Sequence, residues 1–373
     1  MTQTRPRILF VDDEPMILTG LRNGLRRHAA RWDMSFAANA EEALAQLASA
    51  GIAVLVSDMR MPGMDGVALL ETVRASSAHT TRILLTGYAD PDAMASGAMV
   101  AHQLLRKPCP LATIALALER GCRLDAVLRD PATAQIAAEC VAIAPPASVY
   151  GDVARALAYP ELPAVDISAS LANDPTTCAR ILALCTPSFG FDRAYTTAAE
   201  AVVQLGPELI GPLALASHLW AALEPFVEPR SLREAQLHGL EIAHLARPLD
   251  RVSASETFTC SLVHDVGKLL LEQRAPAAYA AVVARAAATG TPQHVVEREV
   301  FGTTHGELIA RLLAGWGVAL PILDALIEAA TPAAAGSLAA ALATAHDVAD
   351  HLVRRRADGS CSSRIPIVSA ATR

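Results

Sequence analysis

The chain has few aromatic residues, no paired cysteine motif and no long apolar run, and each shortage excludes a class of protein. Phe, Trp and Tyr together make up 4% of the 373 residues. Ala, Leu and Val must therefore supply most of the core, which favours closely packed helices. None of the seven cysteines belongs to a CxxC pair, so we expect reduced thiols in a cytoplasmic protein and not a disulfide framework. No apolar run reaches the ~18 residues that a membrane span needs, so no membrane span is expected.

The charge balance argues against nucleic acid as the main partner. The chain carries 31 Lys and Arg against 38 Asp and Glu, a net charge of −7, and has no basic block. A protein that binds nucleic acid needs a basic patch to neutralise phosphates. With 52% hydrophobic and 18% charged residues, the composition is typical of a well-buried globular protein. The length allows two or more domains.

Short apolar runs separated by amphipathic stretches predict a parallel sheet in the first 110 residues. Helical patterns such as PMILTGLRNGLRRHAA and AEEALAQLASAG lie between the runs. Alternation of short buried strands with helices is typical of βαβ units. We therefore expect an α/β domain with a doubly wound, five-stranded parallel sheet whose strands cover residues 7–11, 33–38, 53–57, 82–87 and 101–107.

The strand pattern disappears after Pro110, and the rest of the chain is predicted to be all-helical. The segment APPAS, at residues 144–148, breaks the helical pattern and marks a boundary. The last residues are small and polar, with little pattern. We expect four parts, which are a sheet domain at 1–126, a helical linker at 127–145, an all-helical domain at 146–352 and a flexible tail at 353–373.

Acidic and polar side chains follow the strands of the predicted sheet. Asp12 and Asp13 end the first strand, Asp58 ends a middle strand, and Thr86 and Lys107 end the last two. Because the carboxyl ends of parallel strands meet at one edge of a sheet, we expect these five side chains to converge there. Three crowded carboxylates repel one another, and a hard cation with oxygen ligands lowers that cost. The sequence therefore predicts a Mg²⁺ site at this edge.

Such a site suits phosphoryl transfer. The cation screens the charge of an incoming phosphoryl group, and Asp58 attacks phosphorus to become an acyl phosphate. Lys107 can then pair with one phosphoryl oxygen while Thr86 donates a hydrogen bond to another. These three residues are the candidate catalytic set.

Residues 5–125 resemble the receiver domain of two-component response regulators. The segments VDDE, SDMRMPGMDG, LLTGYAD and RKPC stand in the order and spacing of that family. The resemblance implies a flavodoxin-like fold in which Asp12, Asp13 and Asp58 bind Mg²⁺ together with the backbone carbonyl of Met59. It also implies that Asp58 accepts the phosphoryl group from a sensor histidine kinase or a phosphotransfer protein.

The same resemblance assigns the sensing of the phosphate to Thr86 and Lys107 and implies a cis Lys107–Pro108 bond. One position departs from the family pattern. Receiver domains often have an aromatic residue three positions before the lysine, which rotates inward on activation, and here that position is Leu104. His102 is a nearby candidate for the same role.

A second group of chemistry-bearing residues lies in the helical half. SLVHDVGKLLL places His264 beside Asp265, and EAQLHGLEIAHLA places His238 on a helix face with aliphatic residues. TAHDVADHLV adds Asp350. Two imidazoles and two carboxylates can bind a divalent metal, which would suit activated water and phosphoester hydrolysis. A structural interpretation stays open, in which His238 is a core histidine hydrogen-bonded to Asp265.

Residues 146–352 resemble an HDOD domain, a relative of the HD phosphohydrolases. The segments LANDPTTCARILALCTPSFG, AVVQLGPELIGPLALA, LVHDVGKL and REVFGTTHGELIARLLAGWGV carry the resemblance. It implies a regulatory or scaffolding module without established hydrolase activity. The H-H-E and G-Y-P motifs of the branch that acts on cyclic dinucleotides are missing from the sequence. His305, in FGTTHGE, is a further candidate metal ligand or a capping residue.

The sequence therefore predicts a cytoplasmic response regulator of a two-component phosphorelay. Asp58 accepts a phosphoryl group with Mg²⁺, and the HDOD domain acts on a downstream protein target by protein–protein interaction and not as an enzyme. Phosphorylation is expected to change docking between the two halves or formation of a homodimer. The alternative is a phosphorylation-gated, metal-dependent HD-type phosphohydrolase acting on a nucleotide or a cyclic dinucleotide.

Overall fold

The chain divides into two compact units. Unit 1 comprises Met1–Ala134 with Leu313–Asp324, and unit 2 comprises Gln135–Leu312 with Ala325–Arg373. Asp350 and the tail expected at 353–373 lie outside the described residues. The computed structural model describes residues 5–49, 51–87, 96–97, 100–139, 167–187, 191–246, 254–328, 338, 340, 341 and 343–345.

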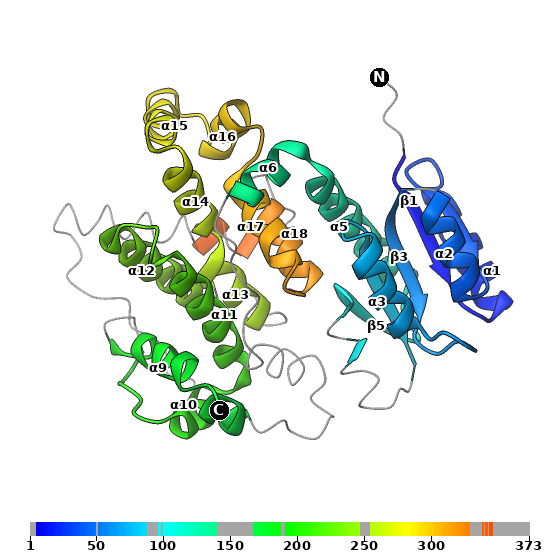
Figure 1. The fold of residues 1–373 in the computed structure, drawn as a ribbon, viewed down its shortest axis with the longest axis horizontal. Helices are drawn as coiled ribbons and strands as arrows, with labels where there is room; N and C mark the ends of the chain where they lie inside the picture. The colour runs from blue at the N-terminus through cyan, green and yellow to red at the C-terminus, as the bar shows by residue number, and fades with distance from the viewer. Residues whose placement is uncertain are drawn as a thin grey trace. The chain divides into compact units, whose positions relative to one another are not determined.

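Unit 1 is built on a five-stranded parallel sheet (Figure 1). The strand order is β2-β1-β3-β4-β5, and each neighbouring pair is parallel. This arrangement confirms the predicted α/β sheet, and each strand lies close to its expected range. The strands are β1 (Arg7–Val11), β2 (Asp33–Ala37), β3 (Ile52–Asp58), β4 (Thr81–Thr86) and β5 (Gln103–Arg106).

Helices cover both faces of this sheet, as the doubly wound fold requires. A Cβ added to Gly121 of α5 would lie 3.1 Å from the side chain of Thr81, and one added to Gly66 of α3 would lie 2.9 Å from that of Leu84. Thr81 and Leu84 are three residues apart in β4 and therefore point to opposite faces. The helices of this unit are α1 (Pro15–Gly24), the 3₁₀ helix η1 (Arg26–His28), α2 (Ala40–Ser49), α3 (Gly66–Ser76) and α5 (Leu111–Arg129), and α6 (Pro131–Glu139) continues from it into unit 2.

The register of the strands brings their carboxyl ends to one edge. Strands β3 and β4 are buried over almost their whole length, because helices lie on both faces, and they accordingly read as continuous apolar runs. Val11 pairs with Ser57, Asp58 with Leu85, and Thr86 with Arg106. The residue after each strand therefore lies at the same rim of the sheet.

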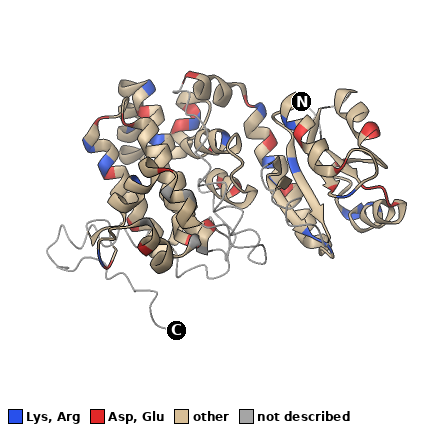
Figure 2. Cartoon of the chain, turned by 60° about the horizontal axis from the view of Figure 1, so that its bottom comes forward, with Lys and Arg blue, Asp and Glu red and all other residues tan. Residues whose placement is uncertain are grey.

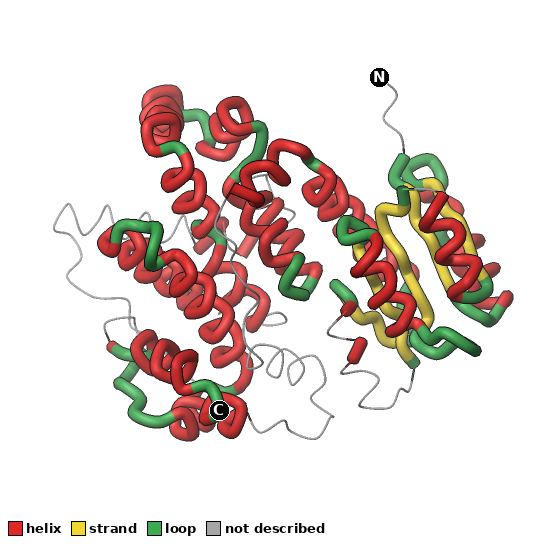
Figure 3. Tube along the Cα trace, in the orientation of Figure 1, coloured by secondary structure: helices red, strands yellow, loops and turns green. Residues whose placement is uncertain are grey.

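In the described residues of unit 2, helices joined by loops are the regular structure, and no strand occurs (Figure 3). This confirms the all-helical prediction. Trp220 and Phe258 are the largest of its fully buried side chains. Its helices are α8 (Ile167–Ala172), α9 (Pro175–Leu184), α10 (Ala198–Leu205), α11 (Pro207–Leu223), α12 (Pro229–Ala246), α13 (Ala254–Val263), α14 (Val266–Arg274), α15 (Pro276–Thr289), α16 (Gln293–Phe301), α17 (His305–Ala314, which runs into the segment counted with unit 1) and α18 (Leu320–Glu328, which leaves that segment).

Two glycines let helices of unit 2 approach closely beside the HD residues. A Cβ at Gly239 of α12 would lie 2.9 Å from the carbonyl oxygen of Leu262 in α13. A Cβ at Gly267 of α14 would lie 2.1 Å from the carbonyl oxygen of His305, where α17 begins. Real Cβ atoms do not come so close, so only glycine fits at these two crossings. The crossings bring His238 near His264 and place His305 against the start of α14.

Charge is distributed without large regions of one sign. Acidic and basic residues are scattered over the described helices and strands of both units (Figure 2). No helix in the described part of the chain is both long enough and apolar enough to span a bilayer.

Candidate functional site

The side chains predicted at the strand ends form one polar pocket in unit 1. Asp12 is only 1% exposed and joins the pocket through an ion pair with Lys107. Asp13 is exposed directly after it. The structure therefore brings the five residues expected at the sheet edge together, and the pocket is lined by Asp13, Glu14, Asp58, Met59, Arg60, Thr86, Gly87 and Lys107.

Lys107 links two of the three carboxylates. Its Nζ atom lies 2.8 Å from Asp12 Oδ2 and 2.5 Å from Asp58 Oδ1. Burial alone would lower the pKa of Lys107, but the hydrogen bonds to Asp12 and Asp58 outweigh it and raise that pKa. The charged ammonium thus offsets part of the repulsion between the acids. The Lys107–Pro108 bond is cis, as the receiver resemblance implies.

Backbone N–H groups fix the remaining oxygens of the two acids. The N–H of Glu14 donates to Asp12 Oδ1 at 3.0 Å, and the N–H of Arg60 donates to Asp58 Oδ2 at 2.9 Å. Each carboxylate is therefore held on one oxygen by the backbone and on the other by Lys107. The phosphoacceptor candidate has a fixed orientation before any ligand arrives.

The Met-Pro-Gly turn after β3 folds the chain back over the phosphoacceptor candidate. The carbonyl of Met59 accepts a hydrogen bond from the N–H of Gly66 at 3.0 Å. A Cβ at Gly66 would lie 2.0 Å from the carbonyl oxygen of Asp58, so only glycine permits this return. Gly63, with a φ of 79°, supplies the left-handed residue of the turn. The sharp break after Asp58 therefore holds Met59, through its carbonyl and Gly66, at the lining of the pocket.

Thr86 lies at the end of β4 with its hydroxyl turned to local partners. The residue is fully buried, and Oγ1 donates to the carbonyl oxygen of Gly87 at 3.2 Å and lies 3.5 Å from Met59 Sδ. To bind a phosphoryl oxygen, the hydroxyl must leave the Gly87 carbonyl. Binding of a phosphoryl oxygen by this hydroxyl would therefore require a local change at the end of β4.

The chemistry of this pocket fits a magnesium ion. Asp12, Asp13 and Asp58 offer carboxylate oxygens, and Met59 offers a backbone carbonyl. Oxygen donors around an open position are what Mg²⁺ prefers in proteins, because it keeps several waters in its octahedral shell.

His102 is fixed in place and is unsuited to act as a rotating switch. It is 2% exposed, and the backbone N–H of Arg82 donates to its Nδ1 atom at 3.0 Å. Burial and the nearby Arg82 charge hold the pKa of His102 well below its usual range. Rotation of the ring would break the bond to Arg82 inside the core. Leu104, at the aromatic position of the family, is half-buried and pairs with Leu84 in β4.

In unit 2 the HD residues form a compact cluster at the start of α14. One ligand atom from each of His238, His264 and Asp265 lies within 4.8 Å of the others. His264 Nε2 is 3.1 Å and His238 Nε2 is 3.6 Å from the Asp265 carboxylate. The structure thus brings together three of the four residues predicted from the HD pattern. The fourth, Asp350, lies outside the described residues.

Lys268 is a neighbour of this cluster that the sequence reading did not include. Its Nζ atom lies 2.8 Å from Asp265 Oδ1, three residues along α14. Burial would raise the pKa of Asp265, but the charges of His264, Lys268 and His305 outweigh burial and hold that pKa well below its usual range. The sequence HDVGK could have predicted this contact. Asp265 and Lys268 are three residues apart, and residues at that spacing share a helix face.

The two units correspond to two protein families. Unit 1 has the parallel sheet and acidic rim of a receiver, and a family model described as response regulator receiver domain matches residues 8–119. A model described as HDOD domain matches residues 143–332. The chain therefore belongs to the HDOD family and carries a response regulator receiver domain ahead of its HDOD domain. Receiver domains generally use Mg²⁺, and HD-type domains often bind divalent metals.

Individual relatives match part of the chain. Transcriptional regulatory protein TrcR of Mycobacterium tuberculosis is 38% identical over 80 residues, 21% of this chain and 30% of that protein. Protein-glutamate methylesterase/protein-glutamine glutaminase 5 of Myxococcus xanthus is 29% identical over 222 residues, 59% of this chain and 57% of that protein. The chain spans less than a third of the length of TrcR and of two further regulators, DctD of Rhizobium meliloti and HoxA of Cupriavidus necator.

One solved structure is similar over most of this chain. It comes from Shewanella amazonensis SB2B and is provisionally named a phosphohydrolase. It is 26% identical in sequence, with a TM-score of 0.50, and the match covers 61% of this chain and 83% of that one.

Proposed function

We propose that this protein is a cytoplasmic response regulator that accepts a phosphoryl group on Asp58 and relays that state to its HDOD domain. The observation that carries the proposal is the contact of Lys107 Nζ with both Asp12 and Asp58 in one pocket at the sheet edge. A sensor histidine kinase or a phosphotransfer protein supplies the phosphoryl group. The output is a protein–protein interaction with a downstream target, and a homodimer is one form that this interaction can take.

The chemical step is a transfer from a phosphohistidine to Asp58. A carboxylate oxygen of Asp58 attacks phosphorus, the new O–P bond forms, and the P–N bond breaks with its electron pair returning to the imidazole nitrogen. Asp12, Asp13 and the Met59 carbonyl would hold Mg²⁺ together with Asp58, and the ion would neutralise charge on the phosphoryl oxygens. Lys107 keeps its charge and pairs with one of those oxygens.

Thr86 connects the chemistry to the rest of the receiver. When its hydroxyl donates to a phosphoryl oxygen, it gives up the hydrogen bond to the Gly87 carbonyl. This change shifts the conformation at the end of β4. It also affects the neighbouring strand β5, because Arg106 of β5 pairs with Thr86 of β4. Helix α5, which packs on β4, continues through α6 toward the HDOD domain and is a covalent route for the signal.

Hydrogen exchange of the full-length protein tests the relay. Addition of Mg²⁺ and beryllofluoride, a phosphoryl mimic, is expected to change exchange rates in helices α12 to α17 as well as in β4 and β5. The Asp58→Ala protein, which cannot bind the mimic at the acceptor, is the control and should show neither change. Changes confined to the receiver in the wild-type protein would contradict the relay.

A metal-dependent phosphohydrolase acting on a nucleotide or a cyclic dinucleotide is the second candidate. The observation that favours it is the convergence of donor atoms from His238, His264 and Asp265 within 4.8 Å. The similar Shewanella structure carries a phosphohydrolase name, which adds support to this reading.

Metal analysis of the purified protein separates the two candidates. If the HD cluster is a metal centre, the full-length protein contains close to one Mn, Fe or Zn per chain, and His264→Ala loses it. The matched control is His294→Ala, which removes the same ring from a residue outside the cluster. A protein that binds none of these metals at the cluster would eliminate the hydrolase and leave the interaction role.

A further inference from the structure

Residues 313–324 lie within the match to the HDOD family model, yet they are part of unit 1. We call this segment the strap. It comprises the end of α17, a turn and the start of α18. Leu313, Val318, Leu320 and Leu323 are completely buried. The strap is therefore a packed element and not an exposed loop.

Asp324 anchors the strap to α5. Arg123 donates from Nε to Asp324 Oδ1 at 2.6 Å and from Nη2 to Oδ2 at 2.8 Å. Arg120, three residues earlier on the same face of α5, has its Nε atom 3.3 Å from Asp324 Oδ2. Asp324 is only 3% exposed, and a bidentate pairing of arginine with a carboxylate is among the stronger polar contacts. One buried acid thus binds two cations of α5.

His102 attaches the strap to the sheet. The N–H of Leu320, the first residue of α18, donates to the carbonyl oxygen of His102 at 2.8 Å. The first N–H groups of a helix have no acceptor within it, so this bond satisfies one of them. The Nδ1 atom of His102 accepts from the N–H of Arg82, which leaves the ring proton on Nε2, and the ring also hydrogen-bonds to the backbone of Ala314. His102 therefore joins β4 to both sides of the turn in the strap.

Strand β5 connects this attachment to the pocket at Asp58. The strand starts directly after His102 and ends directly before Lys107, and its 4 residues span about 13 Å. At the pocket, the N–H of Lys107 donates to the carbonyl oxygen of Thr86 at 2.6 Å. Because His102 is fixed at the other end of so short a strand, a displacement of β5 at the pocket acts on the contacts of the strap.

The docked strap accompanies the unphosphorylated arrangement of the pocket. In the same structure Lys107 pairs with Asp58, and the hydroxyl of Thr86 donates to the carbonyl oxygen of Gly87. Both groups that would contact a phosphoryl oxygen are therefore engaged elsewhere. A contact that stabilises one of two conformations opposes any ligand that needs the other.

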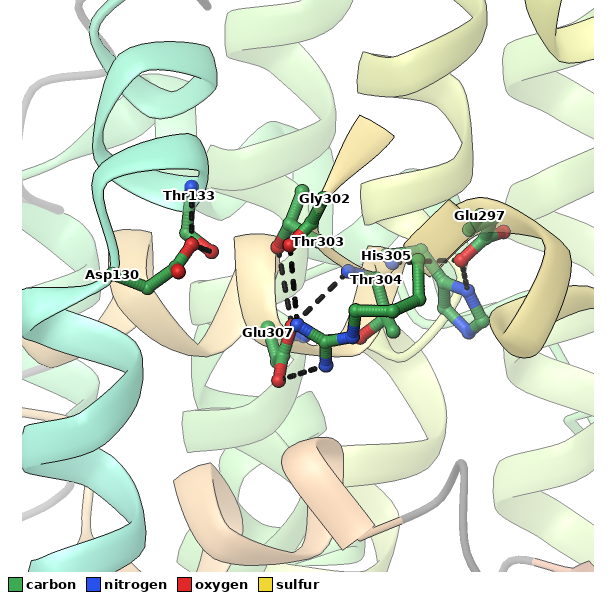
Figure 4. Close-up of polar contacts among 9 residues, drawn as sticks. Asp130, Thr133, Glu297, Gly302, Thr303, Thr304, His305 and Glu307 are labelled. Atoms are coloured by element: carbon green, nitrogen blue, oxygen red, sulfur yellow. Dashed lines mark hydrogen bonds and ion pairs between the residues drawn. The ribbon is translucent and has the colours of Figure 1, made fainter. Parts of the chain in front are cut away.

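The strap differs from the covalent junction at which α5 passes into α6. There Asp130 Oδ2 accepts hydrogen bonds from the N–H and the hydroxyl of Thr133 at 2.7 and 2.6 Å, which fixes the start of α6 (Figure 4). That junction is closed by residues three positions apart. Arg123 and Asp324 are 201 positions apart, and their contact can break without unfolding a helix. The strap is thus the attachment suited to reversible release.

We propose that the strap is an autoinhibitory element whose docking on α5 and β5, anchored by Asp324, favours the unphosphorylated conformation of the pocket at Asp58. This inference rests on the proposed phosphorylation of Asp58 and adds the regulation of that site. Because coupling between two sites is reciprocal, phosphorylation of Asp58 releases the strap. Helices α17 and α18 continue from the two ends of the strap into unit 2, so the release acts on the HDOD domain through the chain itself.

Binding of beryllofluoride to the full-length protein with Mg²⁺, followed by titration calorimetry, tests the inhibition. Asp324→Asn keeps the size of the side chain but removes the charge that pairs with Arg123 and Arg120. We expect it to lower the beryllofluoride concentration at half-saturation by about 5-fold or more, as for a typical allosteric coupling. Arg123→Gln should act in the same direction, and the double variant should change the concentration by less than the product of the two single fold-changes. Asp33→Asn, the same change at an exposed acid of unit 1, should bind as the wild type does.

Hydrogen exchange of the wild-type protein tests the reciprocal effect and does not depend on how a variant folds. Mg²⁺ and beryllofluoride are expected to speed exchange at the N–H of Leu320 and in the rest of the strap. Unchanged exchange in the strap, or half-saturation of Asp324→Asn at or above the wild-type concentration, would overturn the autoinhibitory role and leave Asp58 as the acceptor. Failure of the wild-type protein to bind beryllofluoride would instead overturn the proposed function on which the inference rests.

Discussion

Replacing Asp58 by alanine is expected to abolish phosphorylation of the protein by acetyl phosphate or by a donor kinase. Asp58 is the one carboxylate of the pocket at the end of the central strand β3, held by Lys107 on Oδ1 and by the Arg60 N–H on Oδ2. Without its side chain there is no oxygen positioned to form the acyl phosphate. The measurement is incorporation of labelled phosphate with Mg²⁺ present, followed by hydroxylamine treatment, which cleaves acyl phosphates.

The matched control is Asp33→Ala, because Asp33 is an exposed acid at the start of β2, paired with Arg7. The Asp33→Ala variant removes the same charge from the same unit. Asp33 lies at the beginning of a strand, away from the edge that holds Asp58, so this variant should be labelled like the wild type. Equal labelling of the Asp58→Ala protein would contradict the whole account of the receiver. Loss of labelling in both variants would indicate a general effect of charge or folding.

The sheet and its acidic rim were predictable because both follow from local pattern. A strand buried on both faces reads as a continuous apolar run, and in a parallel sheet all such runs end at one edge. The sequence could not distinguish Asp12 from Asp13, since both follow β1. The structure does, because Asp12 is 1% exposed and paired with Lys107 whereas Asp13 faces solvent.

In the helical unit, the motif predicted the cluster but not the polar pairs formed by neighbouring helices. His238, His264 and Asp265 stood out as residue types that bind metals, and three helices bring them together. Glu297 gave no comparable signal, because it lies eight residues before His305, across a turn between α16 and α17. A long-range pairing of that kind depends on the helix crossings, and single-sequence periodicity carries no information about them.

The crossing at Gly267 is expected to show a large loss of stability when the glycine is replaced. Gly267→Ala places a Cβ 2.1 Å from the carbonyl oxygen and 2.7 Å from the carbonyl carbon of His305. These are backbone atoms that cannot rotate away, so α14 and α17 must separate. Overpacking of this kind costs about 1–3 kcal/mol, and more where backbone must move. We expect a lower unfolding midpoint of the full-length protein, measured by calorimetry, and faster hydrogen exchange in α14.

The control for the added methyl group is Gly20→Ala in α1, where a Cβ would meet no atom within 4 Å. Alanine is a better helix former than glycine, so this variant should gain roughly 0.5–1 kcal/mol of stability. Opposite signs for the two substitutions would show that the crossing, and not helix propensity, requires Gly267. If Gly267→Ala left the midpoint and the exchange of α14 unchanged, that result would contradict the close approach of α14 and the start of α17.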